Sequence, residues 1–341
     1  MKTLAVKYRP MTFEDVVEQD TIKRTLLNQI QTKTIKNCYL FCGPAGCSKT
    51  TQARIFAKEL NGSSSNIVEL DAASHSGVDN FRGLLEESRL KPIGTPYRIF
   101  IVDECHALSS SAWQAALKST EEPTPTSIFI FCTTDPQKIP KTILSRVQRF
   151  NFKRISLPGI KSRLKFIISK ENEEGNNFTY TEDAIDYIAK LADGGMRDSI
   201  KLLEQTLDYC NDVTIESVTK AIGTADYGTM FDLTDCFCKY DKKRVIEIVE
   251  TVYRDGIDLK QFIKNYLHFV LDMTVYDVIR DFDYIQIPNT YEDKIKQYTP
   301  EDFQFFVSLL DTLLKLNSDI KWDGSPKPHV IATFVILCSE A

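Results

Sequence analysis

The segment from Gly43 to Thr50 constrains the fold of this 341-residue chain more than any other. It lies between an apolar run at 39–42 and an amphipathic helical pattern at 49–60. An apolar strand, a glycine-containing loop and a helix in this order form a cradle of backbone N–H groups for phosphate, and the helix N-terminus adds partial positive charge. We therefore expect a nucleotide-binding loop made of Gly43, Pro44, Ala45, Gly46, Cys47, Ser48, Lys49, Thr50 and Thr51.

The last residues of this loop carry its chemistry. Lys49 is expected to reach the β- and γ-phosphates, and the Thr50 hydroxyl to ligate Mg²⁺. Ser48 departs from the usual pattern, because it stands where glycine is expected and its Cβ can crowd the phosphate. We expect ATP binding to be retained. The alternative is a degenerate loop that binds no nucleotide.

Two later segments place acidic and hydroxyl groups after apolar runs. The run at 99–102 is followed by Asp103 and Glu104, and the run at 128–132 by Thr133 and Thr134. In a nucleotide hydrolase, the first acid supports the Mg²⁺ shell, the second orients the attacking water, and a hydroxyl at this edge senses the γ-phosphate. The alternatives are solvated acids at a strand end and ordinary turn chemistry.

Two arginines are candidates for contacts with phosphate. Arg146 follows the segment 139–144 and is placed to act as an arginine finger on the nucleotide of a neighbouring subunit. Arg197 follows Gly194 and Gly195 at the start of a helical pattern, where it can close onto phosphates. The alternative for each is a surface charge.

The pattern of apolar residues changes near residue 157. Before it, five short apolar runs, at 39–42, 67–70, 99–102, 128–132 and 147–152, alternate with helical periodicities. Such alternation predicts an α/β domain with a parallel sheet between helices. After it, we expect no strands and a series of helices. We expect three domains: an ATPase core (1–157), a helical lid (158–223) and a helical collar that oligomerises (224–341).

Charge divides at the same place. Residues 1–157 carry 21 basic and 15 acidic side chains, a net +6, whereas residues 158–341 carry 21 and 32, a net −11. A basic N-terminal part is suited to a polyanion, although chance variation is the alternative. The nine cysteines are an odd number and several lie in apolar runs, so we expect reduced thiols, no structural metal and a cytoplasmic protein. No apolar run predicts a signal peptide or a membrane span.

Short motifs in a fixed order resemble a known family. They are Lys7-Tyr8-Arg9-Pro10, 13–17, the loop at 43–50, Glu69 to Ser74, Val102 to His106, Glu121-Glu122-Pro123, Thr133 to Lys138, Leu144-Ser145-Arg146 and Gly195 to Asp198. Together they resemble the gamma/tau subunit of the bacterial DNA polymerase III clamp loader. The likeness extends more loosely to the last helices. It is specific because the motifs occur jointly.

The resemblance implies an AAA+ ATPase with a core, a lid and a collar that builds a pentameric ring. It assigns Mg²⁺ support to Asp103, the catalytic carboxylate to Glu104, sensor 1 to Thr134, the trans-acting finger to Arg146 and sensor 2 to Arg197. It also implies an adenine site formed by Tyr8, Arg9, Pro10, Val16 and Val17.

The chain departs from the family pattern in four ways. The stretch 61–66 is too short for the four-cysteine zinc module that family members carry there. Glu18 replaces a glycine, and Val147 replaces the cysteine after Arg146. The sequence stops at Ala341 without the tau extension, so nothing in it supports tethering of polymerase. This compact form suits a phage-encoded loader.

The function that we expect is a switch. ATP binding favours a ring that opens a sliding clamp and grips primer-template DNA, and hydrolysis releases the clamp. DNA contacts are expected to be to phosphates, around 74–82 and 109–111. The partners are other loader subunits, the clamp and DNA, with no membrane. Two alternatives stay open: a non-hydrolysing structural subunit, and another AAA+ motor such as a helicase or helicase loader.

Overall fold

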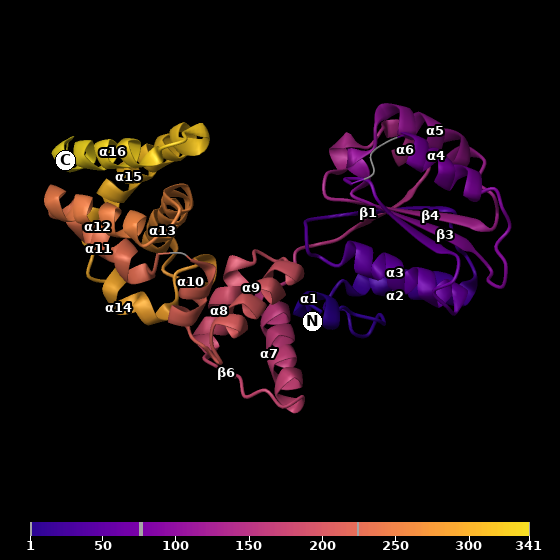
Figure 1. The fold of residues 1–341 in the computed structure, drawn as a ribbon, viewed down its shortest axis with the longest axis horizontal. Helices are drawn as coiled ribbons and strands as arrows, with labels where there is room; N and C mark the ends of the chain where they lie inside the picture. The colour runs from indigo at the N-terminus through magenta and orange to yellow at the C-terminus, as the bar shows by residue number, and fades with distance from the viewer. Residues whose placement is uncertain (1, 75–77, 224, 341) are drawn as a thin grey trace. The chain divides into compact units, whose positions relative to one another are not determined.

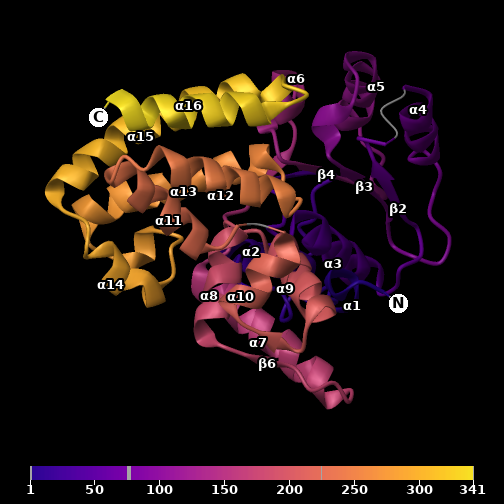
Figure 2. The same ribbon diagram turned by 60° about the vertical axis from the view of Figure 1, so that its left-hand side comes forward.

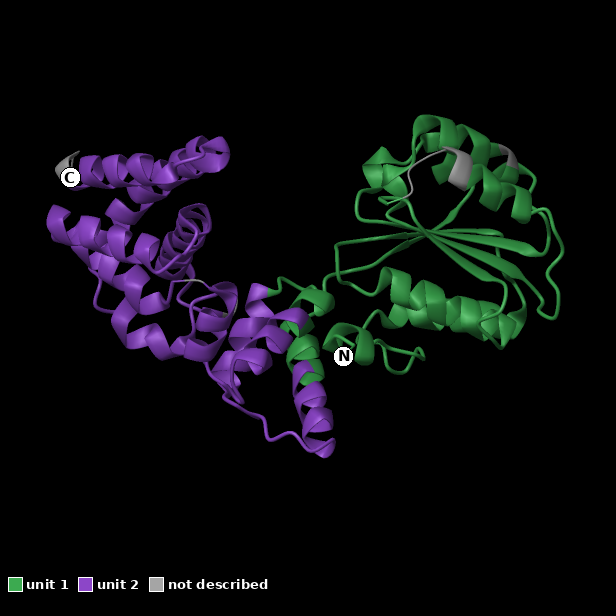
Figure 3. Ribbon diagram, viewed as in Figure 1, with its two compact units in different colours: residues 1–163, 192–200 green, residues 164–191, 201–341 purple. Residues whose placement is uncertain are grey.

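The computed structural model describes residues 2–74, 78–223 and 225–340. The chain forms two compact units (Figure 3). Unit 1 contains residues 1–163 and 192–200, and unit 2 contains residues 164–191 and 201–341. The short segment 192–200 therefore belongs with the N-terminal part of the chain, although it comes from the middle of the sequence.

A five-stranded parallel sheet forms the centre of unit 1 (Figure 1). Its spatial order is β2-β3-β4-β1-β5, and every neighbouring pair is parallel. This confirms the parallel sheet predicted from the five apolar runs. The strands are β1 (Cys38–Cys42), β2 (Ile67–Asp71), β3 (Arg98–Asp103), β4 (Ser127–Thr133) and β5 (Gln148–Asn151).

Helices cover both faces of this sheet. Tyr39 and Phe41 of β1 face the layer formed by α2 and α3, whereas Leu40 faces the layer formed by α4 and α5 (Figure 1). Because both faces are buried, the strands are apolar at consecutive positions rather than at alternate ones. The helical elements of unit 1 are α1 (Leu4–Lys7), α2 (Asp20–Thr32), α3 (Lys49–Asn61), α4 (Val78–Glu87), η1 (Cys105–Ala107), α5 (Ser110–Glu121), η2 (Pro136–Lys138) and α6 (Lys141–Leu144).

Four helices come next along the chain. They are α7 (Leu157–Glu173), α8 (Glu182–Leu191), α9 (Met196–Tyr209) and α10 (Ile215–Ile222). The first residues of α7 and α9 belong to unit 1. Between them, β6 (Thr179–Tyr180) and β7 (Asp212–Val213) pair in parallel. The expectation of no strands after residue 157 was therefore wrong. Two-residue strands leave no periodicity in a sequence, and Val213 lies in β7, just before α10 begins at Ile215.

The described part of unit 2 after residue 225 consists of α-helices and short 3₁₀ helices. Helix α13 packs on α15, and α16 lies across α12 and α15 (Figure 2). Rings such as Phe231, Tyr266 and Phe269 fill the centre, with a Phe231–Phe269 centroid distance of 4.8 Å. The elements are α11 (Tyr227–Cys238), α12 (Lys242–Arg254), α13 (Leu259–Ile279), η3 (Phe282–Tyr284), η4 (Asn289–Tyr291), α14 (Glu292–Ile295), α15 (Pro300–Asp319), η5 (Ile320–Trp322) and α16 (Pro326–Glu340).

The division into two units differs from the three predicted domains, because unit 2 includes helices on both sides of residue 223. The boundaries 1–157, 158–223 and 224–341 stay predictions. Throughout the residues that the structure describes, no helix has both the length and the apolar character needed to cross a membrane.

Candidate nucleotide site

The phosphate-loop segment connects the end of β1 to the start of α3. Gly43 N–H donates to the Thr133 carbonyl at 3.2 Å, so the first residue of the loop is fastened to the end of β4. A Cβ on Gly43 would lie 2.6 Å from the Phe152 carbonyl oxygen, which only glycine avoids. The loop is thus positioned by the two strands that flank β1.

Lys49 is buried at the start of α3, with 6% of its surface exposed. Its ammonium donates to the carbonyl oxygens of Gly43, at 2.8 Å, and Pro44, at 2.7 Å. The charge therefore lies within the loop, where phosphate oxygens can replace these carbonyls as acceptors.

Ser48 adopts the left-handed conformation, with φ 75° and ψ 18°. The position at which the sequence departs from the glycine pattern is thus one that favours glycine. Gly46 is also left-handed, with φ 71°. The loop keeps the expected shape with serine in place, at a conformational cost of about 1 kcal/mol.

Thr50 and Asp103 meet at the end of β3. The Thr50 hydroxyl donates to Asp103 Oδ2 at 2.8 Å. Burial raises the pKa of Asp103, against hydrogen bonds donated by Thr50 and by the Glu104 N–H. A hydroxyl and a carboxylate are hard oxygen donors, and Mg²⁺ needs few protein ligands because it keeps waters and binds substrate phosphates. This donor pair fits Mg²⁺.

Glu104 follows β3 with a left-handed backbone, at φ 45° and ψ 42°. Its Oε2 accepts the Thr134 hydroxyl at 3.0 Å, which joins the ends of β3 and β4. His106 Nδ1 lies 3.3 Å from the same oxygen. The contact between Glu104 and Thr134 joins two residues that the sequence had singled out separately.

The start of α9 packs against the phosphate loop within unit 1. Met196 N–H donates to the Gly46 carbonyl at 3.1 Å, and a Cβ on Gly46 would lie 3.0 Å from Gly195 Cα. Arg197, the next residue, is exposed. The structure therefore brings the segment that carries Arg197 to the loop, in agreement with the inclusion of 192–200 in unit 1.

Arg146 is held by its own subunit. Its guanidinium lies 2.9 Å from Glu121 Oε1, and it also donates to the Thr142 carbonyl and to Ser145 Oγ. These partners come from α5 and the α6 segment rather than from the phosphate loop. The structure thus does not bring Arg146 to the loop of the same chain.

The N-terminal segment is attached to α7. Arg163 donates to the Tyr8 carbonyl at 2.6 Å, and Val16 is buried with its carbonyl accepting from Lys23 at 3.0 Å. Arg9, Pro10 and Val17 are half-buried, and Val16 shares a hydrophobic core cluster with Cys47 of the phosphate loop. Their adenine-site assignment stays a prediction.

Comparison with known families covers most of the chain. A model of the DNA polymerase III delta subunit matches residues 61–156, the ATPase lid domain of the DNA polymerase III clamp loader subunit matches 159–212, and domain III of subunits gamma and tau matches 213–337. DNA polymerase III subunit tau of Bacillus subtilis is 32% identical over 98% of this chain. The chain belongs to the DNA polymerase III gamma/tau family. This confirms the resemblance drawn from its motifs.

Other gamma/tau relatives show similar identity. The Mycobacterium tuberculosis H37Rv protein is 33% identical over 81% of this chain, and the Mycoplasma pneumoniae protein is 33% identical over 81%. The chain spans 62% of the Bacillus relative, 51% of the Mycobacterium relative and 43% of the Mycoplasma relative.

Solved structures confirm the fold of this gamma/tau-family chain. The RuvB Holliday junction branch migration motor of Thermotoga maritima superposes with a TM-score of 0.53, at 18% identity, covering 86% of this chain and 99% of RuvB. At that identity the likeness shows the fold alone, which is that of an AAA+ module followed by helical domains.

The sequence predicted no contact for two residues, His106 in the site and Glu18 near α7, that make specific contacts in the structure. His106 was quoted only as part of a motif, although its ring contacts Glu104 and Thr133. Glu18 has φ 57°, and its carboxylate accepts Ser156 N–H at 3.2 Å, next to the N-terminus of α7. A glycine is the expected residue for that backbone, and its replacement by Glu18 adds a cap for the helix. The available signal was the departure from glycine itself.

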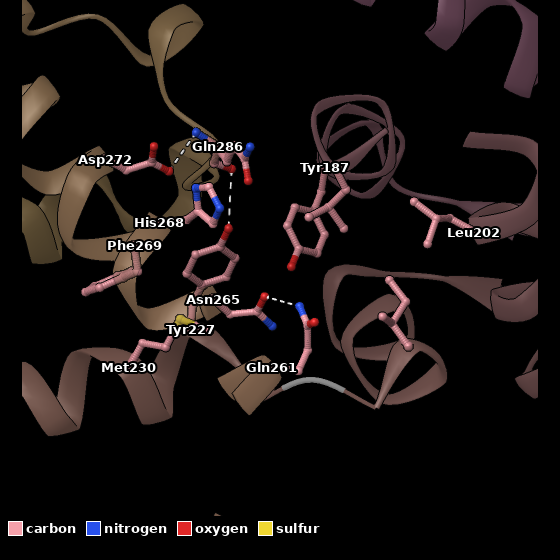
Figure 4. A pocket seen from close by; sticks show the side chains of 12 residues that line it. Tyr187, Leu202, Tyr227, Met230, Gln261, Asn265, His268, Phe269, Asp272 and Gln286 are labelled. Carbon is pink, nitrogen blue, oxygen red and sulfur yellow. Dashed lines mark hydrogen bonds between the residues drawn. The ribbon is translucent and has the colours of Figure 1, made fainter. Parts of the chain in front are cut away.

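Unit 2 contains a cavity of about 190 Å³. Tyr187, Tyr227, Asn265 and His268 extend into it from α8, α11 and α13 (Figure 4). Its lining residues belong to unit 2 alone, so it is separate from the phosphate loop. Among residues 2–74, 78–223 and 225–340, no group of three His, Cys, Asp or Glu side chains is arranged to hold a metal.

Proposed function

We propose that this chain is the ATPase motor subunit of a loader that places sliding clamps on primer-template DNA. One observation carries the proposal: Lys49, the Thr50–Asp103 pair and the Glu104–Thr134 pair come together around the carboxyl ends of parallel strands. Ligands of open α/β sheets bind at this edge. Membership of the gamma/tau family supports a loader rather than another kind of nucleotide hydrolase.

The side chains then have distinct roles in ATP chemistry. Lys49 exchanges its carbonyl partners for phosphate oxygens, and backbone N–H groups of residues 45–48 donate to the same phosphates. Thr50 and Asp103 would hold Mg²⁺, which supplies neutralisation of phosphate charge. Glu104 orients the attacking water, and the Thr134 hydroxyl donates a hydrogen bond to the Glu104 carboxylate. Arg197 is delivered to the loop by the start of α9.

Arg146 acts on the nucleotide of a neighbouring subunit in this proposal. Its exposed pair with Glu121 is weak, because a solvent-exposed ion pair contributes at most about 1 kcal/mol. In a ring of subunits, the triphosphate bound by the neighbouring subunit carries more negative charge than the Glu121 carboxylate, and Arg146 can pair with it instead. ATP between subunits thus stabilises the ring that opens the clamp, and hydrolysis removes those contacts.

Further predictions from the sequence belong to the same proposal. DNA contacts are to phosphates through 74–82 and 109–111, of which 75–77 lie outside the described residues. The core, lid and collar have the boundaries predicted from the sequence, the partners are other loader subunits in a heteropentamer, and the compartment is the cytoplasm.

The test is ATP turnover by the reconstituted loader, with and without clamp and primed DNA. Lys49→Ala and Arg146→Ala are compared with Lys58→Ala on α3 and Arg149→Ala on β5, which lie outside the proposed chemistry. We expect clamp- and DNA-stimulated turnover that falls at least about 100-fold for the first two variants and stays within about twofold for the controls. Stimulated turnover unaffected by Lys49→Ala and Arg146→Ala would contradict the proposal.

A second candidate is a non-hydrolysing structural subunit, favoured by the left-handed Ser48 at a glycine position. It predicts nucleotide binding without turnover by the wild-type chain. The presence of Lys49 within the loop, and of Thr50 and Glu104 hydrogen-bonded to Asp103, favours the motor instead. Turnover stimulated by unprimed or junction DNA without a clamp would point to a helicase or helicase loader.

A further inference from the structure

One oxygen of Glu104 is contacted by side chains from two separate elements. Oε2 accepts the Thr134 hydroxyl at 3.0 Å, and His106 Nδ1, in η1, lies 3.3 Å from it. Nδ1 is also 3.2 Å from Thr133 Oγ1. The imidazole thus lies between the last residue of β4 and the carboxylate that follows β3.

The neighbours of Nδ1 determine which tautomer fits. A lone pair on Nδ1 would face the carboxylate oxygen of Glu104, which is an acceptor when ionised. A hydrogen on Nδ1 instead can be donated to Thr133 Oγ1, at 3.2 Å, and carries partial positive charge towards Glu104 Oε2, at 3.3 Å. Thr133 is completely buried and its Oγ1 also accepts the Asp135 N–H at 3.0 Å. Thr133 therefore gives the ring a fixed anchor at the strand end.

The Glu104 side chain needs contacts that restrict its rotamers, because a glutamate side chain has several rotatable bonds. The side chain of Glu104 is 35% exposed, and its backbone has the left-handed φ of 45°. A half-exposed glutamate samples several rotamers, and only those that face the water can assist hydrolysis. Two donors on Oε2 leave Oε1 available for a proton of water.

We propose that His106 is a positioning residue that acts with Thr134 to hold the Glu104 carboxylate in its hydrolytic orientation. The inference rests on the proposed function, in which Glu104 acts on the attacking water. It assigns to His106 an effect on the rate of hydrolysis and none on ATP binding, because its contacts are with Glu104 and Thr133 rather than with the loop at 43–50.

The test compares three substitutions in the reconstituted loader with clamp and primed DNA. His106→Ala removes the donor, His106→Asn offers an amide N–H near the place of Nδ1, and His106→Gln places its amide near the place of Nε2. We expect kcat to fall about tenfold for alanine and glutamine, and to recover to within about threefold for asparagine. KM and the Kd for ATP stay within about twofold in all three. His268→Ala, on α13, is the control.

A double variant tests the shared role of the two donors. Thr134→Val and His106→Ala each release the same oxygen, so their effects on kcat are coupled. We expect the double variant to lose less than the product of the two single losses. A loss equal to that product would contradict the joint restraint.

The outcomes separate this inference from the proposed function. If the wild-type loader shows no turnover, or Lys49→Ala retains it, the proposed function fails. If wild type is active, Lys49→Ala is inactive and His106→Ala keeps its kcat, the positioning role fails alone. Equal losses for His106→Asn and His106→Ala, with a lowered unfolding temperature, would show a structural role and overturn the inference.

Discussion

At the scale of single residues, the phosphate loop contains a serine in a conformation that favours glycine. Ser48 has φ 75°, so Ser48→Gly removes backbone strain of about 1 kcal/mol from the folded state. Glycine also gives the unfolded chain more conformational entropy, which lowers the stability by a smaller amount. We expect Ser48→Gly to have a higher unfolding temperature than Ser48→Ala, which keeps the Cβ. Thermal unfolding of both variants measures this. A more stable alanine variant would show that the serine conformation is unstrained.

Gly43 and Gly83 make a matched pair for a second prediction. A Cβ on Gly43 would lie 2.6 Å from the Phe152 carbonyl, whereas a Cβ on Gly83 in α4 meets nothing within 4 Å. Gly43→Ala should destabilise unit 1 by at least about 2 kcal/mol and weaken ATP binding. Gly83→Ala should stabilise it by about 0.5–1 kcal/mol, because alanine favours helices. Denaturant unfolding of the two variants would contradict this account if it gave equal shifts.

Contacts between side chains from different elements were the part of the site that was hardest to predict from the sequence. The strand–loop–helix pattern predicted Lys49 and Thr50, and the acids after an apolar run predicted Asp103 and Glu104. The contact of His106 with Thr133 depends on β3 and β4 being neighbours in the sheet, which one sequence does not specify. The pairing of Arg146 with Glu121 similarly depends on how α5 packs near α6.

At the scale of elements, Asp272 joins α13 to the segment that follows it. Its Oδ2 accepts the N–H groups of Gln286, at 2.8 Å, and Ile287, at 3.1 Å. Burial raises the pKa of Asp272 to about 6, against these hydrogen bonds and the nearby charge of Lys190. The ordinary value for aspartate is near 4, so the folded chain retains a proton there that the unfolded chain has lost.

This carboxyl predicts how stability depends on pH. Between about pH 4 and pH 6 the folded state binds more protons at Asp272, so stability falls as pH rises through this window. Asp272→Asn should remove the fall, which is at most about 3 kcal/mol, while its side-chain oxygen still accepts both N–H groups. Unfolding of wild type and variant across this range is the measurement. Parallel curves for the two proteins would contradict the assignment.

Elements with long patterns were predictable, and short ones were not. The five strands of the sheet were found because burial on both faces requires consecutive apolar residues. The pair β6 and β7 was missed because two residues carry no period. The inclusion of 192–200 in unit 1 goes with contacts between residues far apart in the sequence, such as the hydrogen bond from the Met196 N–H to the Gly46 carbonyl.

At the scale of the whole molecule, charge is distributed unevenly between the two parts of the sequence. Residues 1–157 carry a net +6 and residues 158–341 a net −11. If the basic part meets DNA phosphates, binding of primer-template by the assembled loader depends on salt. We expect at least about a tenfold loss of affinity between about 50 and 200 mM salt, as for two or more phosphate contacts. Titration at several salt concentrations that gave one affinity would contradict phosphate contact.

In the proposed function, the loop at 43–50 binds ATP with Mg²⁺ through Lys49. Equilibrium titration of the purified chain with ATP and Mg²⁺ tests it directly, with Lys49→Ala as the probe and Lys58→Ala as the control on the same helix. We predict saturable binding by wild type and Lys58→Ala. The Kd for ATP should rise at least about tenfold in Lys49→Ala, because this variant loses a charge-assisted contact with phosphate. Equal binding by all three proteins, or none by wild type, would contradict the claim.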